Sequence, residues 1–346
     1  MSAGTWQGRF PARSNREAQD LAVSSVTVRR DVEALDERGM LARVHGGAVL
    51  REARAATGAQ PWRPPGGQVP RTFGMIVPDA TYYYPEVIKG AREAAGRHGV
   101  RLVLGISRYV EAEERAQAEQ LLADGVDGLL LTPSGSGGDA PWYAELAVPV
   151  VLVERRRGDN TATEHVVTDH AYGARLAVRH LLGLGRKHLG LVLREDSPHA
   201  DAVREGYEAA LAVAGLTAPE SALFVAPAPA DAVSRDYDRN IEAYLDQVAA
   251  GDLDAALVHN DHDALLLLNK LRARGISVPG DLAVVAYDDD LAPLADIPLT
   301  AVAPPKRAVG ASAVDLLLQR VSDPDRPPHR LSILPELHIR SSTARD

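Results

Sequence analysis

Short apolar segments alternate with amphipathic segments through most of the chain, and this alternation restricts the fold more than any other feature. The segments TFGMIVP, VRLVLGIS, GLLLTP and VPVVLVE are apolar and β-branched, and longer segments of helical periodicity separate them. The same order resumes after EHVVTD and continues through HLGLVLR, DAALVHN and LAVVAYDD. Apolar strands joined by helices form parallel sheets that helices cover on both faces. The sequence therefore predicts an α/β body of two doubly wound parallel sheets.

Length and composition restrict the class of protein further. The chain has 346 residues, enough for two or three domains, and its 45% hydrophobic and 25% charged residues are typical of a folded soluble protein. It contains no cysteine, which excludes disulfides and thiolate metal sites. It has neither an apolar run of about 20 residues nor a secretory signal pattern, so we expect a cytoplasmic protein that does not cross a membrane.

The charge is unevenly distributed along the chain. Residues 1–54 contain nine Arg and Lys residues and seven Asp and Glu residues, a net charge of +2, although the whole chain carries −9. An acidic body argues against a protein whose whole surface coats nucleic acid. The weakly basic first segment predicts that contact with a polyanion is confined to that segment.

The segment SSVTVRRDVEALDERGMLARVHGGAV, residues 24–49, has the pattern of a capped helix followed by a hairpin. Ser25 can cap the helix through its hydroxyl. One stripe of the helix is apolar and consists of Val28, Val32 and Leu35. Two short extended runs follow, joined by the turn His-Gly-Gly. The pattern predicts a winged helix-turn-helix, and a solvated surface helix is the alternative for the helical part.

These patterns divide the chain into three parts. We expect a winged helix-turn-helix head over residues 1–54, a linker over residues 55–70, and a two-lobed body over residues 71–346. The linker, AATGAQPWRPPGGQVP, contains four prolines and three glycines and has no apolar period. Such a composition is typical of a flexible or extended connector.

The string VSSVTVRRDVEALDERGMLARVHGGAV resembles the signature of the DeoR family of bacterial repressors. The resemblance implies that the head binds operator DNA. It implies that the residues facing DNA, in the helix and then in the wing, are Ser25, Thr27, Arg29, Arg30, Arg43 and His45. A recognition helix of this kind enters the major groove, and the wing contacts the backbone or the minor groove.

Polar side chains follow the strands of the body at their carboxyl ends, where doubly wound sheets bind ligands. They are residues 82–84, Glu154, Arg155, Asp169, Asn260, Asp261 and residues 288–290. Carboxylates and arginine bond vicinal hydroxyls well, and aromatic rings stack on the apolar faces of sugars. The set predicts a neutral polyhydroxylated ligand in a closing cleft between two lobes. For any single aspartate or asparagine, helix capping is the alternative.

Residues 71–342 resemble the effector domain of the LacI/GalR regulators, which is similar to periplasmic sugar-binding proteins. The matching strings include VPDATYYYPEVIKGAREAA, VPVVLVERR, VVTDHAYGARLAVRHLLGLGRKHLGLV and VHNDHDALLLLNKLRARGISVPGDLAVVAYDD. The resemblance implies a type I periplasmic-binding-protein-like fold and a homodimer. The resemblance also implies that Arg155, Asp169, Asp261 and Asp288 belong to the effector site. The strand-end residues Tyr82 and Tyr84 complete the predicted site. The family usually has an arginine where Val203 stands, and Arg204, one place further, is included in the site.

The two resemblances together describe a hybrid, a DeoR-type head on a LacI-type sensor. We expect a transcriptional repressor of carbohydrate-metabolism genes whose DNA affinity is controlled by a small sugar-like effector. A sugar-binding protein of a transport system, without DNA-binding activity, is the alternative function.

Enzymatic activity is not expected. The sequence contains no GxSxG motif, no HExxH motif, no glycine-rich phosphate loop and no cysteine nucleophile. His259, His262 and Asp263 could suggest a metal pair, but their loose spacing favours cap and surface roles. We therefore expect no catalytic residue, no metal and no cofactor.

Overall fold

The structure is a computed structural model of the chain, and it describes residues 41–44, 47–50, 71–134, 142–156, 162–194, 197–217, 223–226 and 235–344. The chain divides into two compact units, Met1–Gln68 and Val69–Asp346. In the first unit, β1 (Leu41–Val44) and β2 (Gly47–Leu50) pair as an antiparallel hairpin. This is the hairpin that the sequence predicts. The expected recognition helix, residue His45 and the linker lie outside the described residues.

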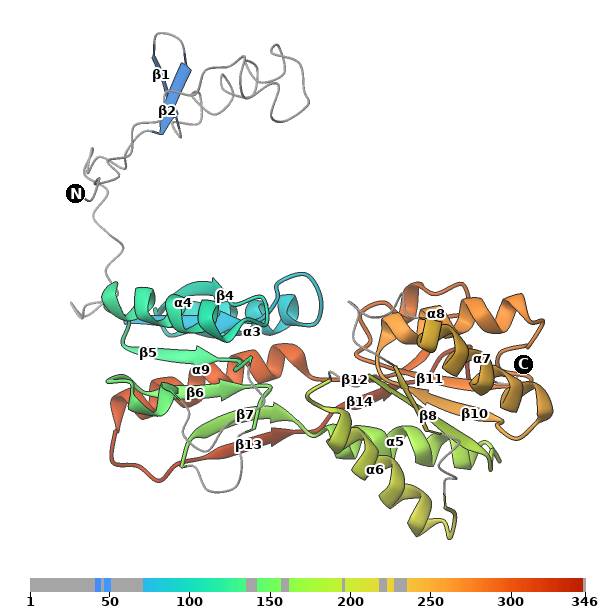
Figure 1. Cartoon of the computed structure of the whole chain (residues 1–346). Coiled ribbons are helices and arrows are strands. Elements are labelled where there is room, and N and C mark those ends of the chain that lie inside the picture. The colour runs from blue at the N-terminus through green and yellow to red at the C-terminus, as the bar shows by residue number, and fades with distance from the viewer. Residues whose placement is uncertain are drawn as a thin grey trace. The chain divides into compact units, whose positions relative to one another are not determined.

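The second unit contains two lobes, each built on a six-stranded sheet (Figure 1). The sheet of lobe 1 is parallel and has the order β13-β7-β6-β5-β3-β4. Its strands are β3 (Thr72–Val77), β4 (Arg101–Ile106), β5 (Gly128–Leu131), β6 (Val150–Val153), β7 (Glu164–Thr168) and β13 (Arg330–Ile333). One face is covered by α3 (Tyr84–Arg97) and α9 (Lys306–Ser322), and the other by α4 (Glu111–Ala123) and the 3-10 helix η1 (Trp142–Glu145).

The sheet of lobe 2 has the order β14-β12-β11-β10-β8-β9, and only β14 is antiparallel to its neighbour. Its strands are β8 (Leu189–Arg194), β9 (Leu223–Ala226), β10 (Ala255–Val258), β11 (Ala283–Tyr287), β12 (Thr300–Ala303) and β14 (Glu336–His338). Helices α5 (His170–Gly183) and α6 (Ala200–Val213) cover one face, and α7 (Arg235–Ala250) and α8 (Asp261–Ala273) the other. The 3-10 helix η3 (Ala292–Leu294) follows β11. None of the helices in the described part of the chain has the length and hydropathy needed to cross a bilayer.

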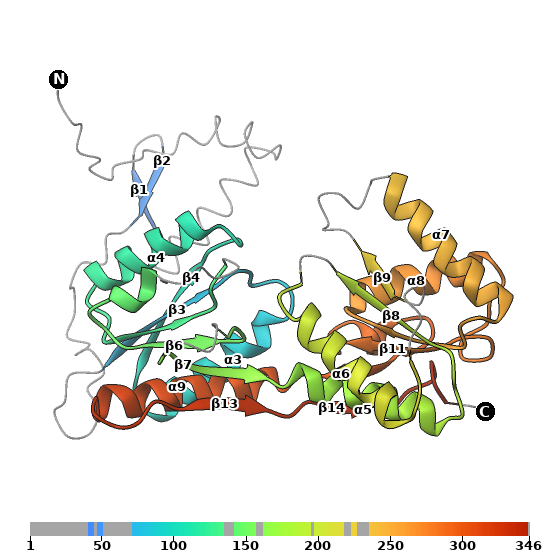
Figure 2. The same ribbon diagram turned by 60° about the horizontal axis from the view of Figure 1, so that its bottom comes forward.

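The chain passes between the lobes three times. The crossovers lie between Thr168 and His170, between Ala303 and Lys306, and between Ile333 and Glu336. Figures 1 and 2 show that α9 and β13, which come from the end of the chain and are drawn in red, lie beside the green strands of lobe 1. Each lobe is therefore assembled from distant parts of the sequence, and any movement of one lobe against the other acts on all three crossovers.

Helices α3 and α9 pack closely because each has a glycine against the backbone of the other. A Cβ atom on Gly90 would lie 2.0 Å from the carbonyl oxygen of Arg307, and one on Gly310 would lie 1.9 Å from that of Val87. No side chain fits at these distances, so substitution at either glycine would force the helices apart. Since α9 begins directly after the second crossover, this contact also fixes the first residue of α9 against lobe 1.

Candidate functional site

Three loops at the carboxyl ends of strands contain buried non-glycine residues with positive φ. Tyr83 (61°) and Glu154 (55°) follow β3 and β6 in lobe 1, and Asp288 (91°) follows β11 in lobe 2. This backbone region costs an ordinary residue about 1–3 kcal/mol and persists only where surrounding contacts fix it. Strained loops of this kind cluster at functional sites, so we locate the candidate site where they occur.

Glu154 is the centre of the lobe 1 part of the site. Its carboxylate accepts hydrogen bonds from the Tyr83 hydroxyl (2.7 Å), the Thr168 amide (3.0 Å) and the Thr168 hydroxyl (2.9 Å). Nε2 of His170 lies 3.8 Å from Oε2 of Glu154. Burial alone would raise the pKa of Glu154, but His170 and these hydrogen bonds outweigh it and hold the pKa below its ordinary value. The carboxylate is therefore charged at neutral pH although it is buried.

Three histidines gather where the first crossover enters lobe 2. His170 stacks on His199 with ring centroids 3.9 Å apart, and its Nδ1 lies 3.2 Å from the Tyr287 hydroxyl. Nε2 of His199 lies 3.2 Å from Nη1 of Arg155, which belongs to lobe 1. Burial, and next the charge of His170, hold the pKa of His199 well below its ordinary value and lower that of His259 to about 3. The imidazoles of His199 and His259 are therefore neutral, and each offers one donor and one acceptor.

Tyr82 and Asp288 form a direct hydrogen bond between the lobes. The Tyr82 hydroxyl of lobe 1 donates to Oδ2 of Asp288 in lobe 2 at 2.9 Å. The Tyr82 ring also lies 4.5 Å from the ring of His262 in lobe 2. Burial raises the pKa of Asp288 to about 7, against the attraction of Lys306. A group that titrates near neutral pH thus stands at a point of contact between the lobes.

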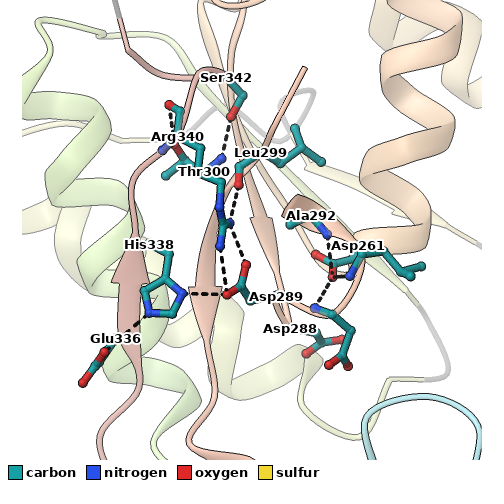
Figure 3. Close-up of polar contacts among 12 residues, drawn as sticks. Asp261, Asp288, Asp289, Ala292, Leu299, Thr300, Glu336, His338, Arg340 and Ser342 are labelled. Carbon is teal, nitrogen blue, oxygen red and sulfur yellow. Dashed lines mark hydrogen bonds and ion pairs between the residues drawn. The ribbon is translucent and has the colours of Figure 1, made fainter. Parts of the chain in front are cut away.

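Asp261, the first residue of α8, supports the loop that follows Asp288 (Figure 3). Its Oδ2 accepts hydrogen bonds from the amides of Asp290 (2.7 Å), Leu291 (2.7 Å) and Ala292 (3.2 Å). Burial raises the pKa of Asp261, and the three amides oppose this effect. One carboxylate oxygen is therefore committed to the loop, while Oδ1 has no hydrogen-bond partner.

Lys306, the first residue of α9, contacts loops of both lobes. Its Nζ lies 2.8 Å from Oδ1 of Asp290 and donates to the carbonyl oxygen of Asp288, both in lobe 2. The same Nζ lies 5.0 Å from the ring centroid of Tyr83 in lobe 1. The side chain is only 6% exposed, and a buried ammonium is tolerated only with partners of these kinds.

Several buried polar atoms of this group have no hydrogen-bond partner, which is rare in folded proteins. In the part of the chain that the structure describes, they include His170 Nε2, His259 Nδ1, Asp261 Oδ1 and Asp290 Oδ2. Carboxylate oxygens accept hydrogen bonds, and neutral imidazole nitrogens donate or accept them. The arrangement can therefore bind an uncharged molecule whose hydroxyl groups both donate and accept.

The structure brings four of the sequence-predicted effector residues into this region. Tyr82, Asp261 and Asp288 belong to the group around Lys306, and Arg155 belongs to the histidine group. Glu154, which the sequence places at a strand end beside Arg155, lies between these groups because it bonds Tyr83 and stands near His170.

The other three predicted effector residues have different surroundings. Tyr84 is the first residue of α3 and is buried in the core of lobe 1. Asp169 is the N-cap of α5, where its Oδ1 accepts from the Tyr172 amide at 2.8 Å. Arg204 lies on α6, and its Nε is buried without a hydrogen-bond partner, while Val203 beside it is part of the lobe 2 core.

Three residues of this group lie outside the strand-end set that the sequence predicts, namely His170, His199 and Lys306, and Tyr83 belongs to that set but not to the predicted effector site. Tyr83 and His170 adjoin predicted residues, so their position beside strand ends is a signal that could have found them. Lys306 gives no such signal, because only the return of the chain through the second crossover brings it to the site.

The three residues that could suggest a metal pair have different neighbours. His259 packs on Tyr287 with ring centroids 4.9 Å apart, His262 packs on Tyr82, and Oδ2 of Asp263 lies 3.6 Å from Arg194. Among the described residues, no group of three or more histidine, aspartate or glutamate side chains is arranged to hold a metal ion.

Two family models match the chain. A DeoR-like helix-turn-helix domain matches residues 14–54, and a periplasmic binding protein-like domain matches residues 178–343. The HTH-type transcriptional repressor PurR of Haemophilus influenzae (strain PittEE) is 31% identical over 281 residues, which cover 79% of this chain and 81% of that protein. The chain belongs to the LacI family of transcriptional regulators. Both resemblances that the sequence suggests are confirmed.

Two further similarities fit this family. The arabinose metabolism transcriptional repressor of Geobacillus stearothermophilus is 26% identical over 343 residues, which cover 94% of this chain and 89% of that protein. A LacI family regulator from Enterococcus faecium, solved with bound ribose, is 26% identical with a TM-score of 0.63, and the match covers 79% of this chain and 99% of that one. As a LacI-family member with a DeoR-like head, the chain is a DNA-binding transcriptional regulator and not an enzyme. The transport alternative is disfavoured, because PurR of Haemophilus influenzae and the arabinose metabolism protein of Geobacillus stearothermophilus are both repressors.

Proposed function

We propose that the protein represses carbohydrate-metabolism genes and that a small, uncharged, sugar-like effector bound between the lobes controls its affinity for operator DNA. The observation that carries this proposal is the set of buried, unpartnered polar atoms on His170, His259, Asp261 and Asp290. Hydroxyl groups both donate and accept, so a polyol matches the carboxylate oxygens and the histidine nitrogens together. The relatives support this class of effector, because one regulates arabinose metabolism and another was solved with ribose.

Control of DNA affinity follows from contacts that span the lobes. A ligand that touches both Asp288 of lobe 2 and Arg155 of lobe 1 favours the state in which the lobes are close. It shifts that equilibrium only by its differential affinity for the two states. The bodies of paired subunits then transmit the change to the heads.

The proposed DNA contacts lie in the head. The recognition helix presents Ser25, Thr27, Arg29 and Arg30, and the wing carries Arg43 and His45. The DeoR-like match over residues 14–54 and the hairpin formed by β1 and β2 support this assignment. A bacterial protein that binds operator DNA acts in the cytoplasm, and we propose that location.

We also propose that the protein acts as a homodimer that pairs through one edge of the lobe 1 sheet. Strand β4 is that edge, and the apolar side chains exposed on it and just after it are Leu104 (44%), Tyr109 (57%) and Val110 (45%). Open strand edges with exposed apolar groups are prone to association unless they are covered. A two-fold axis would cover both edges and would present two heads to a palindromic operator. Sedimentation should give the mass of two chains, and only monomer at micromolar concentration, with and without DNA, would contradict the dimer.

Differential scanning fluorimetry tests the effector class. A ligand that binds only the folded state raises its melting temperature, so neutral pentoses, hexoses and disaccharides should include at least one that does so. The phosphate esters of the same sugars serve as matched probes, because the proposed site provides acceptors and neutral imidazoles for hydroxyl groups. Stabilisation by phosphate esters alone would overturn the proposed effector class. A gel shift on the regulator's own promoter, with and without the stabilising sugar, then tests control of DNA affinity.

A further inference from the structure

The loop that carries Asp288 contains two consecutive strained residues. Asp288 has φ 91° and Asp289 has φ 59°, and both are L-residues with a Cβ atom. This backbone region is costly for such residues, and a pair of them persists only where surrounding contacts over-determine the conformation. The contacts of the loop come from three directions, and one of them, Lys306, begins directly after a crossover between the lobes.

The first set of contacts comes from the segment just beyond the third crossover. Nη1 of Arg340 donates to Oδ1 of Asp289 at 2.6 Å, and Nη2 donates to Oδ2 at 3.1 Å. Nδ1 of His338, at the end of β14, lies 2.6 Å from Oδ2 of the same carboxylate. Figure 3 shows that Arg340 and His338 approach Asp289 from β14 and the chain after it. A two-pronged arginine contact fixes the orientation of a carboxylate as well as its position.

The second set comes from the second crossover. Lys306 donates to the carbonyl oxygen of Asp288 and forms an ion pair with Asp290 at 2.8 Å. The Lys306 ammonium thus binds the residues on either side of Asp289, namely the backbone carbonyl of Asp288 and the side chain of Asp290. The third set is the Asp261 carboxylate, which accepts the amides of residues 290–292.

We propose that Lys306, Asp289 and Arg340 are positioning residues. They hold residues 288–290 in the strained conformation that presents the Asp288 carboxylate to Tyr82 of lobe 1. The proposal rests on the proposed function, in which Asp288 contacts the effector. Because Lys306 begins the helix that follows the second crossover, a movement of the lobes that displaces it also displaces Asp288. Arg340 instead holds the loop from within lobe 2, where its amide and guanidinium bond Thr300 and Leu299. The ligand contact is therefore mechanically coupled to the second crossover.

The variants are chosen to remove contacts without forbidding the backbone conformation. Asp289→Asn removes the charge and keeps a residue type that tolerates positive φ. Arg340→Met removes the two-pronged contact, whereas Arg340→Lys keeps one charged donor. Asp296→Asn is the matched control, because Asp296 forms an ion pair with Arg272 in the same lobe with both side chains largely exposed.

Hydrogen exchange of the full chain without any sugar is the measurement. In Asp289→Asn and Arg340→Met, amides within residues 284–294 should exchange about tenfold faster than in the wild type, because their opening no longer breaks the charged contacts. Arg340→Lys should restore most of the protection, and Asp296→Asn should match the wild type. Urea unfolding, run in parallel, separates this local change from a general loss of stability.

Two results would overturn the proposal. One is wild-type exchange within residues 284–294 in both Asp289→Asn and Arg340→Met. The other is faster exchange by the same factor throughout lobe 2, which would make these residues general stabilisers. The exchange comparison requires no effector, so it fails or succeeds independently of the proposed sugar. If Lys306→Met is added and does not fold, the Asp289 and Arg340 variants still decide the matter.

Discussion

The Tyr83 hydroxyl donates a 2.7 Å hydrogen bond to Oε1 of Glu154, so two strained residues of lobe 1 hold each other in place. Glu154 also accepts from the amide and hydroxyl of Thr168, the last residue before the first crossover. The loops after β3 and β6 are thereby tied to the point where the chain leaves lobe 1. Lys306 joins this group to the lobe 2 loop, since its ammonium lies over the Tyr83 ring.

Removing the Tyr83 hydroxyl tests this link. Tyr83→Phe leaves a buried carboxylate with one donor fewer, and hydrogen bonds to charged groups contribute about 1.5–3 kcal/mol, so the free energy of unfolding should fall by a similar amount. Urea denaturation measures the change. Asp296→Asn, at an exposed ion pair with Arg272, is the control and should alter stability by less than about 0.5 kcal/mol. Equal stability of Tyr83→Phe and the wild type would show that the hydroxyl does not support Glu154.

Asp288 makes stability depend on pH near neutrality. Burial raises its pKa from 3.8 to about 7, with Asp261 and Asp290 adding to the effect and Lys306 and Tyr82 opposing it. Because the pKa of Asp288 is higher in the folded than in the unfolded protein, protonated Asp288 stabilises the folded state. This stabilisation is complete below the unfolded-state pKa and is lost as the pH rises through the folded-state pKa. Relative to Asp288→Asn, the wild type should therefore lose up to a few kcal/mol between about pH 4 and about pH 8. Urea unfolding across this range is the measurement, and a constant difference between the two proteins would contradict the raised pKa.

The strands and helices of the body could largely be predicted because their signal is local. Apolar β-branched runs and helical stripes mark them, and the order of elements follows. Strands β13 and β14 could not be found in this way. They are short and mostly exposed, and β13 pairs with β7, which is more than 150 residues away in the sequence. The periodicity of apolar residues also gives no indication that α9 packs in lobe 1 although the preceding strand, β12, belongs to lobe 2.

The site could be predicted in outline for one physical reason. The carboxyl ends of parallel strands meet at one edge, so polar residues there, such as Asp261 and Asp288, come together. What each side chain does at that edge depends on neighbours from other elements. Asp261 uses one oxygen to bind backbone amides, and Lys306 reaches the group through the second crossover. Neither fact is encoded in the spacing of residues along the chain.

Asp169 allows capping and ligand contact to be separated. Its carboxylate accepts from the Tyr172 amide at the start of α5, and loss of such a cap costs about 0.5–2 kcal/mol. Asp169→Ala should therefore lower the free energy of unfolding by that amount, while Asp169→Asn, which can still cap, should lower it less. Urea denaturation and calorimetry with the identified sugar decide between the roles. Unchanged sugar affinity in Asp169→Ala would make the residue a cap alone.

The arginines of the proposed recognition helix should contribute unequally to DNA binding. An arginine that bonds a base should cost about 1–3 kcal/mol when replaced by alanine and should relax specificity at one position of the operator. An arginine that bonds phosphate should weaken binding on all sequences and lower the salt dependence. Gel shifts with Arg29→Ala and Arg30→Ala on the regulator's own promoter, at several salt concentrations, distinguish the two cases. Wild-type affinity in both variants would overturn the assignment of this helix.

Replacing Asp288 should weaken the effector without affecting the head. Asp288→Ala removes two oxygen atoms that can accept hydrogen bonds from sugar hydroxyls. It leaves those sugar hydroxyls and the Tyr82 hydroxyl without an acceptor, at a cost of about 1–3 kcal/mol. Sugar binding should therefore fall by roughly ten- to a hundredfold, since about 1.4 kcal/mol corresponds to a factor of ten. DNA affinity in the absence of sugar should stay near that of the wild type, because the proposed operator contacts lie in the separate N-terminal unit.

Calorimetry with the identified sugar and a gel shift on the same preparation measure both quantities. Asp296→Ala is the matched control, because it removes a carboxylate from an exposed ion pair of the same lobe. Tyr82→Phe provides a second comparison. It removes the hydroxyl that Asp288 accepts from across the lobes, so it should change sugar affinity if closure depends on that contact. Wild-type sugar affinity in Asp288→Ala would mean that the carboxylate only joins the lobes, and the effector contacts would then have to come from Asp261 and the histidine group.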